Sequence, residues 1–320
     1  MLSTIKAVKI YPRGVRGYGP STFLTDLFGV TGRRLGVVRI SRLCARKRIF
    51  SAKAARVNDG NGCGAKGRGR TLIGRMLSPL ATGIYAGLSA VGAAGLAAGG
   101  CAYAAMWPGS RIFGAALIAP RRAGELALTF DDGPNPKWTP RLLDVLGEHG
   151  VKATFFMLGG RAQAEPELVR RVAAEGHLIG NHSWSHLNLA LSAANKVREE
   201  LARTSDALQQ ITGERVRFIR PPFGARRPAV FRIARELGLR VVMWNAMTSD
   251  WSETSADRIA GQLAAKIERL GRRGRAANVV LHDGGHLERA AERGASVAAA
   301  GMLVERFAGT RRFVRVDVWG

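Results

Sequence analysis

Short apolar runs alternate with amphipathic segments from residue 124 to the last residue of the sequence. Runs rich in β-branched, aromatic and aliphatic residues predict seven strands, at 126–130, 153–158, 177–181, 217–221, 240–245, 278–283 and 312–318. Segments of helical period predict helices between them, each closing on a glycine, at 139–150, 166–176, 192–213, 227–238 and 255–271. This alternation is typical of an α/β fold with a parallel sheet covered on both faces.

Unusual polar residues lie at or just after the ends of these predicted strands. They are Asp131, Asp132, His182, His186, Arg220, Asp250 and His282. Active sites of parallel α/β folds are built at the carboxyl ends of the strands. A single Asp or His there is more often a helix cap or a core hydrogen-bond partner, but the whole set at equivalent positions indicates a functional site.

The spacing of His182 and His186 suits two imidazoles that bind one metal ion. With one carboxylate they supply three ligands, which leaves a coordination position open for water, as in catalytic zinc sites. All three cysteines precede residue 102, so a metal site in the second half of the chain must use His and carboxylate ligands.

Asp131 and Asp132 are adjacent carboxylates at the end of the first predicted strand. Successive side chains of an extended segment point to opposite sides, so the two can have different roles. We expect one to bind the cation and the other to accept a proton from water, with the cation offsetting their repulsion. Gly133 and Pro134 then turn the chain away.

Five motifs, in the order "TFDDGP", "HSWSH", "RPPFG", "DW" at Asp250 and "VVLHD", resemble those of the polysaccharide deacetylase family, also called the NodB-homology domain or carbohydrate esterase family 4. The resemblance extends from about Gly124 to Val318. It implies a distorted, incomplete (β/α) barrel, which agrees with the seven strands predicted independently. It also implies a metal-dependent hydrolase that removes N-acetyl groups from amino sugars.

The same resemblance implies a role for each motif residue. Asp131 would be the catalytic base, with Arg220 orienting it; His282 would be the general acid, with Asp250 setting its protonation; and the metal ligands would be Asp132, His182 and His186.

Three further residues would bind substrate. The backbone N–H near Phe223 would face the developing oxyanion, Trp251 would help to enclose the acetyl methyl group, and Val280 would border the acetyl pocket. Phe223 stands where many relatives have Tyr, which leaves the backbone N–H intact. Val280 stands where Leu is usual, which could enlarge the pocket.

The metal implied is one divalent ion, with Zn²⁺ first and Co²⁺, Ni²⁺ or Mn²⁺ as alternatives, because a His, His, Asp set accepts several ions. The expected substrate is an envelope polysaccharide, peptidoglycan N-acetylglucosamine first and a chitin-like or exopolysaccharide chain next. Two other functions stay open: a catalytically silent carbohydrate-binding protein on the same scaffold, and an amidohydrolase of small amides or formamido sugar lipids.

The N-terminal third has a different composition. Residues 1–75 carry 17 Lys or Arg against two Asp and include a Gly-rich run without period, which predicts a disordered basic leader. No nucleic acid partner is expected, since interleaved aromatics and a known motif are missing.

Residues 76–107 contain no charged residue and exceed the ~20 apolar residues that span a bilayer. We expect a membrane span or signal-anchor here, with membrane contact through 80–107. A linker at 108–123 would lead to the hydrolase domain at 124–320. Because the basic residues precede the span, we expect that domain to be extracytoplasmic. The alternatives are a buried soluble helix and a cleaved signal, the latter with translation starting near Arg75.

Overall fold

The computed structural model describes residues 91–320. The predicted basic leader, residues 1–75, and the first part of the predicted apolar segment, residues 76–90, lie outside the described residues. The predicted hydrolase domain, residues 124–320, is described in full.

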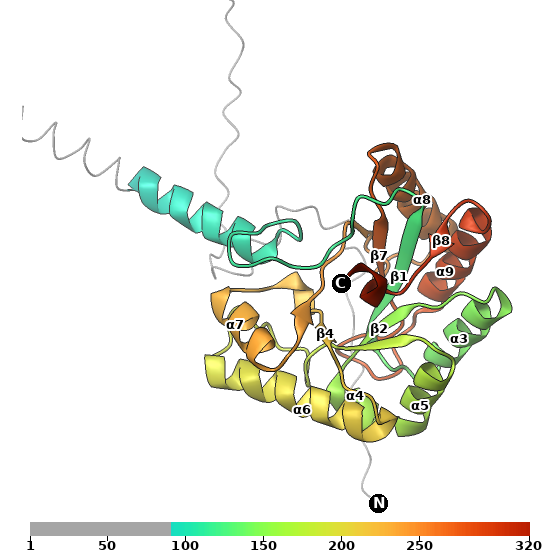
Figure 1. Cartoon of the computed structure of the whole chain (residues 1–320), viewed down its shortest axis with the longest axis horizontal. Helices are drawn as coiled ribbons and strands as arrows, with labels where there is room; N and C mark the ends of the chain where they lie inside the picture. Colours follow the sequence, from blue (N-terminus) through green and yellow to red (C-terminus); the bar gives the residue numbers. More distant parts are fainter. Residues whose placement is uncertain (1–90) are drawn as a thin grey trace, which may run out of the picture. The chain divides into compact units, whose positions relative to one another are not determined.

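The described residues form a parallel β-sheet surrounded by helices (Figure 1). The strands are β1 (Glu125–Gly133), β2 (Thr154–Met157), β3 (Leu178–Asn181), β4 (Phe218–Ile219), β5 (Arg240–Val241), β6 (Ala246–Met247), β7 (Ala277–His282) and β8 (Arg312–Phe313). In space the order is β5-β4-β3-β2-β1-β7-β6, and β8 pairs with the start of β1. All of these pairs are parallel, which confirms the α/β fold that the alternation of strands and helices predicts.

The sheet is curled into an incomplete barrel. β5 and β6 are the end strands of the main order, yet only residues 242–245 separate them along the chain. A chain covers at most roughly 18 Å in five residue steps, so the two edges of the sheet must lie near each other. The distorted, incomplete (β/α) barrel implied by the family resemblance is therefore confirmed.

Helices pack on the outer face of this curled sheet. They are α3 (Thr139–Glu148), α4 (Gly159–Ala164), α5 (Pro166–Ala174), α6 (Ala194–Thr212), α7 (Pro228–Glu236), α8 (Ala256–Arg272) and α9 (Gly294–Phe307). Four of the predicted capping glycines adopt a positive φ after their helices, namely Gly150, Gly176, Gly213 and Gly238. The fifth prediction is wrong, because Gly271 lies inside α8 and Gly274 takes the left-handed conformation instead.

Two apolar clusters divide the core. The larger one lies between sheet and helices and takes Leu126, Leu128 and Phe130 from β1. The smaller one takes Ala127 from the opposite face of β1 and includes Val314 and Val316 from the C-terminal segment. Because side chains alternate along a strand, Thr129 and Asp131 share the inward face of β1 with Ala127. The inward face of β1 is therefore apolar at Ala127, in the smaller cluster, and polar at Thr129 and Asp131.

Residues 91–106 are helical and lead into the domain through the predicted linker, residues 108–123. The linker packs on the barrel: Leu117 is buried, forms a parallel bridge with Val242, and exchanges backbone hydrogen bonds with Val241 and Met243 at 2.9 and 2.8 Å. Within residues 91–320, no helix combines the length and apolar character that crossing a bilayer demands. Since residues 76–90 are not described, the span at 76–107 stays a prediction.

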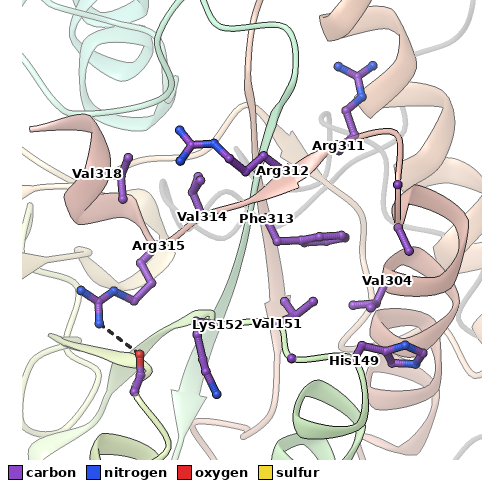
Figure 2. Close-up of a pocket in the computed structure, with 14 residues that line it drawn as sticks. His149, Val151, Lys152, Val304, Arg311, Arg312, Phe313, Val314, Arg315 and Val318 are labelled. Atoms are coloured by element: carbon purple, nitrogen blue, oxygen red, sulfur yellow. Dashed lines mark hydrogen bonds between the residues drawn. The ribbon is translucent and has the colours of Figure 1, made fainter.

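A cavity of about 510 Å³ opens at the amino-terminal ends of the strands (Figure 2). Arg311 and Arg312 point away from Lys152 and Arg315 there, and Arg315 donates to the carbonyl of Gly176 at 3.0 Å. The cations diverge, so they do not form a single binding point for an anion. This cavity lies at the opposite end of the strands from the predicted site residues.

Candidate active site

Asp132, His182 and His186 meet at the carboxyl ends of β1 and β3. The ligand atoms that they offer lie within 4.8 Å of one another, and all three residues are buried. Asp132 Oδ1 lies 3.3 Å from His182 Nε2 and 3.1 Å from His186 Nε2. The three residues that the sequence and the resemblance assign to a metal are thus brought to one point.

The backbone at this point is unusual. Among the described residues, the non-glycine residues with positive φ lie at the end of β1 or in the loops of the site: Asp132, Ser183, His186 and Phe223. Such conformations cost free energy and persist where the surrounding structure enforces them, as it often does at functional sites.

The side chains of Asp131 and Asp132 point in different directions, but regular alternation along a strand is not the cause. Asp132 has a φ of 68°, and the pairing of β1 with β2 shifts register between Asp131 and Gly133. A bulge with a left-handed residue re-aims the side chain of Asp132, while Asp131 keeps its strand position opposite His282 of β7. The expectation of two directions holds, but its assumed cause, regular extended geometry, is wrong.

The three ligand atoms fit a divalent cation. His182 Nδ1 lies 2.7 Å from the carbonyl oxygen of Arg220, so Nδ1–H donates to it and Nε2 keeps its lone pair toward Asp132. Asp132 Oδ1 and His186 Nδ1 are buried and lack a hydrogen-bond partner in the described part of the chain. A carboxylate oxygen that faces two imidazole lone pairs is repelled unless a proton or a cation stands between them, and a metal would satisfy Asp132 Oδ1 and the Nε2 atoms of His182 and His186.

The electrostatics of the set favour the charged carboxylate and neutral imidazole that ligation requires. Burial on its own raises the pKa of Asp132, but the neighbouring imidazoles of His182 and His186 outweigh burial and hold the pKa well below its ordinary value. Burial lowers the pKa of His186. Metal ligands must be deprotonated, so both shifts are in the direction of metal binding.

Asp131 lies beside the ligand set and is held by Arg220. The Arg220 Nη1 atom donates to Asp131 Oδ1 at 2.8 Å and to Thr129 Oγ1 at 2.6 Å. Arg220 is completely buried, with its guanidinium carbon 4.3 Å from the centre of the Phe156 ring. The predicted base is therefore fixed in direction by a cation from the end of β4.

His282 and Asp250 form a second polar pair at the ends of β7 and β6. His282 Nδ1 lies 2.9 Å from Asp250 Oδ1, and the His282 backbone N–H donates to Asp250 Oδ2 at 2.8 Å. Ser296 donates to the same Oδ2 at 2.8 Å. Burial lowers the pKa of His282, but the charge and hydrogen bond of Asp250, with the charges of Asp132 and Asp131, together outweigh burial and raise the pKa to about 9. His282 is therefore protonated at neutral pH.

The three predicted substrate-binding residues lie around these polar groups. Phe223 is 42% exposed and packs its ring edge-on against His186 at 4.5 Å. Trp251 is 47% exposed and packs edge-on against His282 at 5.3 Å. Val280 is buried in β7 opposite Thr129, on the inward face that also carries His282.

Sequence reasoning missed two groups next to the site. His286 lies in the loop after β7, with Nδ1 3.9 Å from Asp132 Oδ2. Asp283 is buried behind the turn at Gly133 and accepts a hydrogen bond from Thr139, and burial raises its pKa to about 7. The run "HDGGH" contained a second histidine four residues after His282, a signal that could have found His286.

Comparison with known proteins decides the family. The model of the polysaccharide deacetylase family matches residues 119–242, which carry the first three motifs. A chitooligosaccharide deacetylase of Rhizobium leguminosarum bv. trifolii is 43% identical over 161 residues, covering 49% of this chain and 70% of the relative. The chain belongs to the polysaccharide deacetylase family. The resemblance drawn from the five motifs is thereby confirmed.

Other members of this family have names that differ in substrate. A peptidoglycan-N-acetylglucosamine deacetylase of Bacillus cereus is 40% identical over 175 residues, which are 54% of this chain and 62% of that protein. The solved structure of the Bc1960 peptidoglycan N-acetylglucosamine deacetylase has a TM-score of 0.57 and 34% identity, covering 63% of this chain and 91% of that chain. The match thus spans less than two thirds of the Bacillus cereus relative.

Proposed function

We propose that this polysaccharide deacetylase is a metal-dependent hydrolase that removes N-acetyl groups from amino sugars of an envelope polysaccharide. One observation carries the proposal: a carboxylate held by Arg220 and an imidazole held by Asp250 lie beside the same three-ligand group. Hydrolysis of an amide needs a base for water and an acid for the leaving amine, and both are present.

Asp132, His182 and His186 would hold the metal, most favourably Zn²⁺, with Co²⁺, Ni²⁺ or Mn²⁺ as alternatives. When bound, the ion supplies Lewis-acid polarisation of the acetamide carbonyl and a lower pKa for water. Asp131 is the neighbour of Asp132 in β1, and Arg220 fixes the direction of its side chain.

Asp131 accepts a proton from the attacking water, since its carboxylate is held in position by Arg220. His282, kept protonated by Asp250, donates a proton to the amine nitrogen as the C–N bond breaks. The backbone N–H of Phe223, in its left-handed turn, is the proposed donor to the oxyanion, and losing such a donor typically costs about 3 to 4 kcal/mol of barrier. Acetate and a free amino sugar are the products.

Peptidoglycan N-acetylglucosamine is the substrate that we propose first, with a chitin-like polymer second. The support is the pair of exposed rings, Phe223 beside His186 and Trp251 beside His282, which offer surfaces on which a sugar could stack. Relatives named for both substrates match the chain. Three other aromatic rings near the motifs have protein partners: Trp138 and Trp244 pack against the apolar core, and the Arg203 guanidinium lies 3.6 Å from the centre of the Trp184 ring.

Acetate release tests the proposal. The Zn²⁺-loaded protein should release acetate from N-acetylglucosamine oligomers and from peptidoglycan, and EDTA treatment should abolish the release. Asp131→Asn should keep the metal and lose roughly 10²- to 10⁴-fold in turnover, while His182→Ala should lose the metal. Polymer binding without acetate release would indicate the silent carbohydrate-binding alternative, and release from small amides alone would indicate the amidohydrolase.

We also propose that the chain is held at a membrane through residues 80–107, with the hydrolase domain outside the cytoplasm. The support is the uncharged stretch 76–107 after a strongly basic leader, and the exposure of Val91 and Leu96 on the helix at 91–106. Fractionation of the native protein with carbonate washing tests anchoring. N-terminal sequencing of the same protein distinguishes the anchor from a cleaved signal.

A further inference from the structure

His286 is a third imidazole at the candidate metal site. It lies in the loop between β7 and α9, with its ring stacked on that of His186 at 4.5 Å and 18° and edge-on to Phe223 at 5.7 Å. Its Nδ1 atom is 3.9 Å from Asp132 Oδ2. His286 is therefore in contact with one expected metal ligand and next to another.

The two carboxylate oxygens of Asp132 face different imidazoles. Oδ1 is directed at His182 and His186, while Oδ2 is the oxygen nearest His286. Two ligand atoms on one tetrahedral zinc, each about 2.1 Å from the ion, lie roughly 3.4 Å apart. His286 Nδ1 lies 3.9 Å from Oδ2, beyond this distance and outside the group of three ligand atoms, so binding requires its 40% exposed side chain to rotate out of the stack on His186.

The backbone before His286 is packed directly against Asp132. A Cβ atom at Gly284 would lie 1.9 Å from the Asp132 carbonyl oxygen, so only glycine permits this approach. Arg293 donates to the Gly284 carbonyl at 2.6 Å, and Arg161 of α4 donates to the Gly285 carbonyl. These contacts fix the loop so that His286 follows at the ligand set.

The backbone after His286 is also held. Arg161 donates through Nη1 to the Arg289 carbonyl at 3.2 Å, and Arg289 donates to the carbonyl of Ala164 at 3.2 Å and to the carboxylate of Glu165. Both flanks of His286 are thus tied to α4 and to the residues directly after it. A solvent-facing histidine on a free loop would need none of these contacts.

We propose that His286 is an exchangeable fourth protein ligand of the divalent metal, bound in the absence of substrate and displaced when substrate enters. The inference rests on the proposed metal dependence of the site. A neutral imidazole nitrogen is a suitable ligand for the same ions that His182 and His186 would bind. Its partial exposure and its distance from Oδ2 are what an exchangeable ligand requires.

Metal affinity and coordination test the inference without reference to turnover. The full chain is loaded with Zn²⁺, its dissociation constant is measured by competition with a chelator, and the number of bound imidazoles is measured by X-ray absorption. We expect three imidazoles in the unsubstituted protein and two in His286→Ala, with a dissociation constant raised roughly tenfold. His286→Asn serves as a second variant of closer size.

His149→Ala is the matched control, because this exposed histidine lies at the end of α3, at the other edge of the sheet. It should leave both measurements unchanged. If the unsubstituted protein binds zinc through two imidazoles and His286→Ala has the same affinity, the inference is overturned while the proposed function stands. If the unsubstituted protein binds no divalent metal at all, both the proposed metal-dependent function and the inference about His286 are overturned.

Discussion

Arg220 places a guanidinium group in the interior of the barrel, where its contacts are with Asp131, Thr129 and the face of Phe156. Burial lowers the pKa of Arg220, and the charge of Asp131 opposes that shift. Desolvating two ions costs free energy that a buried pair regains only with good geometry. We infer that this pair serves to position Asp131 rather than to stabilise the domain.

Removing one partner of this pair should be costly. Arg220→Met leaves Asp131 buried without its cation, so we expect the free energy of unfolding to fall by about 3 to 5 kcal/mol. The double variant Arg220→Met, Asp131→Asn should regain part of that loss, since no unpaired charge then remains. Urea unfolding measures both.

A matched control is the exposed pair of Arg198 and Glu236, which should contribute little because solvent screens it. Arg198→Met should therefore leave the unfolding midpoint nearly unchanged. If Arg220→Met behaves like Arg198→Met, the expected cost of leaving Asp131 buried without its cation is wrong.

The pKa of His282 sets an alkaline limit for activity. Because Asp250 raises that pKa to about 9, the imidazolium is present below pH 9 and is lost as the pH rises through it. The profile of kcat/KM should therefore fall above about pH 9. Asp250→Asn removes a negative charge that raises the pKa of His282. The pKa should therefore drop, and the fall in kcat/KM should move to lower pH.

Glu253 offers the control for this profile. It is a carboxylate of the same loop, but its contacts are with Thr254, Ser255 and Arg258. Glu253→Gln should leave the alkaline fall where it is. An unchanged profile in Asp250→Asn would show that His282 is not the group that titrates.

The ends of β1 and β7 are packed backbone to backbone, and this contact depends on glycine. Gly284→Ala would put a methyl group against the Asp132 carbonyl, so the bulge at Asp132 and the loop must move apart. We expect a loss of roughly 1 to 3 kcal/mol in the free energy of unfolding, as for other overpacked sites. Urea unfolding of the metal-free protein measures it.

Gly261→Ala is the corresponding control inside α8, where nothing lies within 4 Å of the added Cβ. There the substitution should stabilise by roughly 0.5 to 1 kcal/mol, because alanine restricts the unfolded chain and favours helix. Equal effects at both positions would refute the argument from close packing.

The helices and strands that pattern analysis missed are those with weak local signals. β6 has two residues and α4 has six, too few for any period to be visible. α9 is apolar on most sides because it packs against both α3 and α8, so it has no clear polar face. The long strands were predicted as apolar, β-branched runs, since both of their faces are buried. The amphipathic helices were predicted from their helical period, since only one face of each is buried.

Arg226 connects the two described parts of the chain, the helix at 91–106 and the barrel. Its guanidinium is buried and donates to the carbonyls of Gly224 at 2.9 Å, Ala105 at 3.4 Å and Trp107. Its backbone N–H also donates to Ala105 at 3.1 Å. The end of the helix is therefore capped by a side chain of the barrel.

Arg226→Ala should release this connection. We expect faster amide hydrogen exchange in residues 105–112, unchanged exchange in β7, and a loss of roughly 1 to 3 kcal/mol from buried carbonyls left without a donor. Arg227→Ala is the control, because Arg227 donates to the Ser192 carbonyl instead. Exchange in 105–112 that does not respond to Arg226→Ala would contradict the capping role.

Local residue patterns were sufficient for the α/β class, for most of the strands and for the identity of the residues at the strand ends, because periodicity and residue type are local properties of the chain. The motifs were sufficient for the family. The pairings between side chains depended on tertiary structure: Asp132 turns toward the histidines through a bulge and a left-handed backbone, and Arg220 reaches Asp131 from the end of β4. His286 and Asp283 join the site because the loop after β7 packs on the Asp132 backbone. Such long-range approaches of one loop to another have no counterpart in any local pattern of residues.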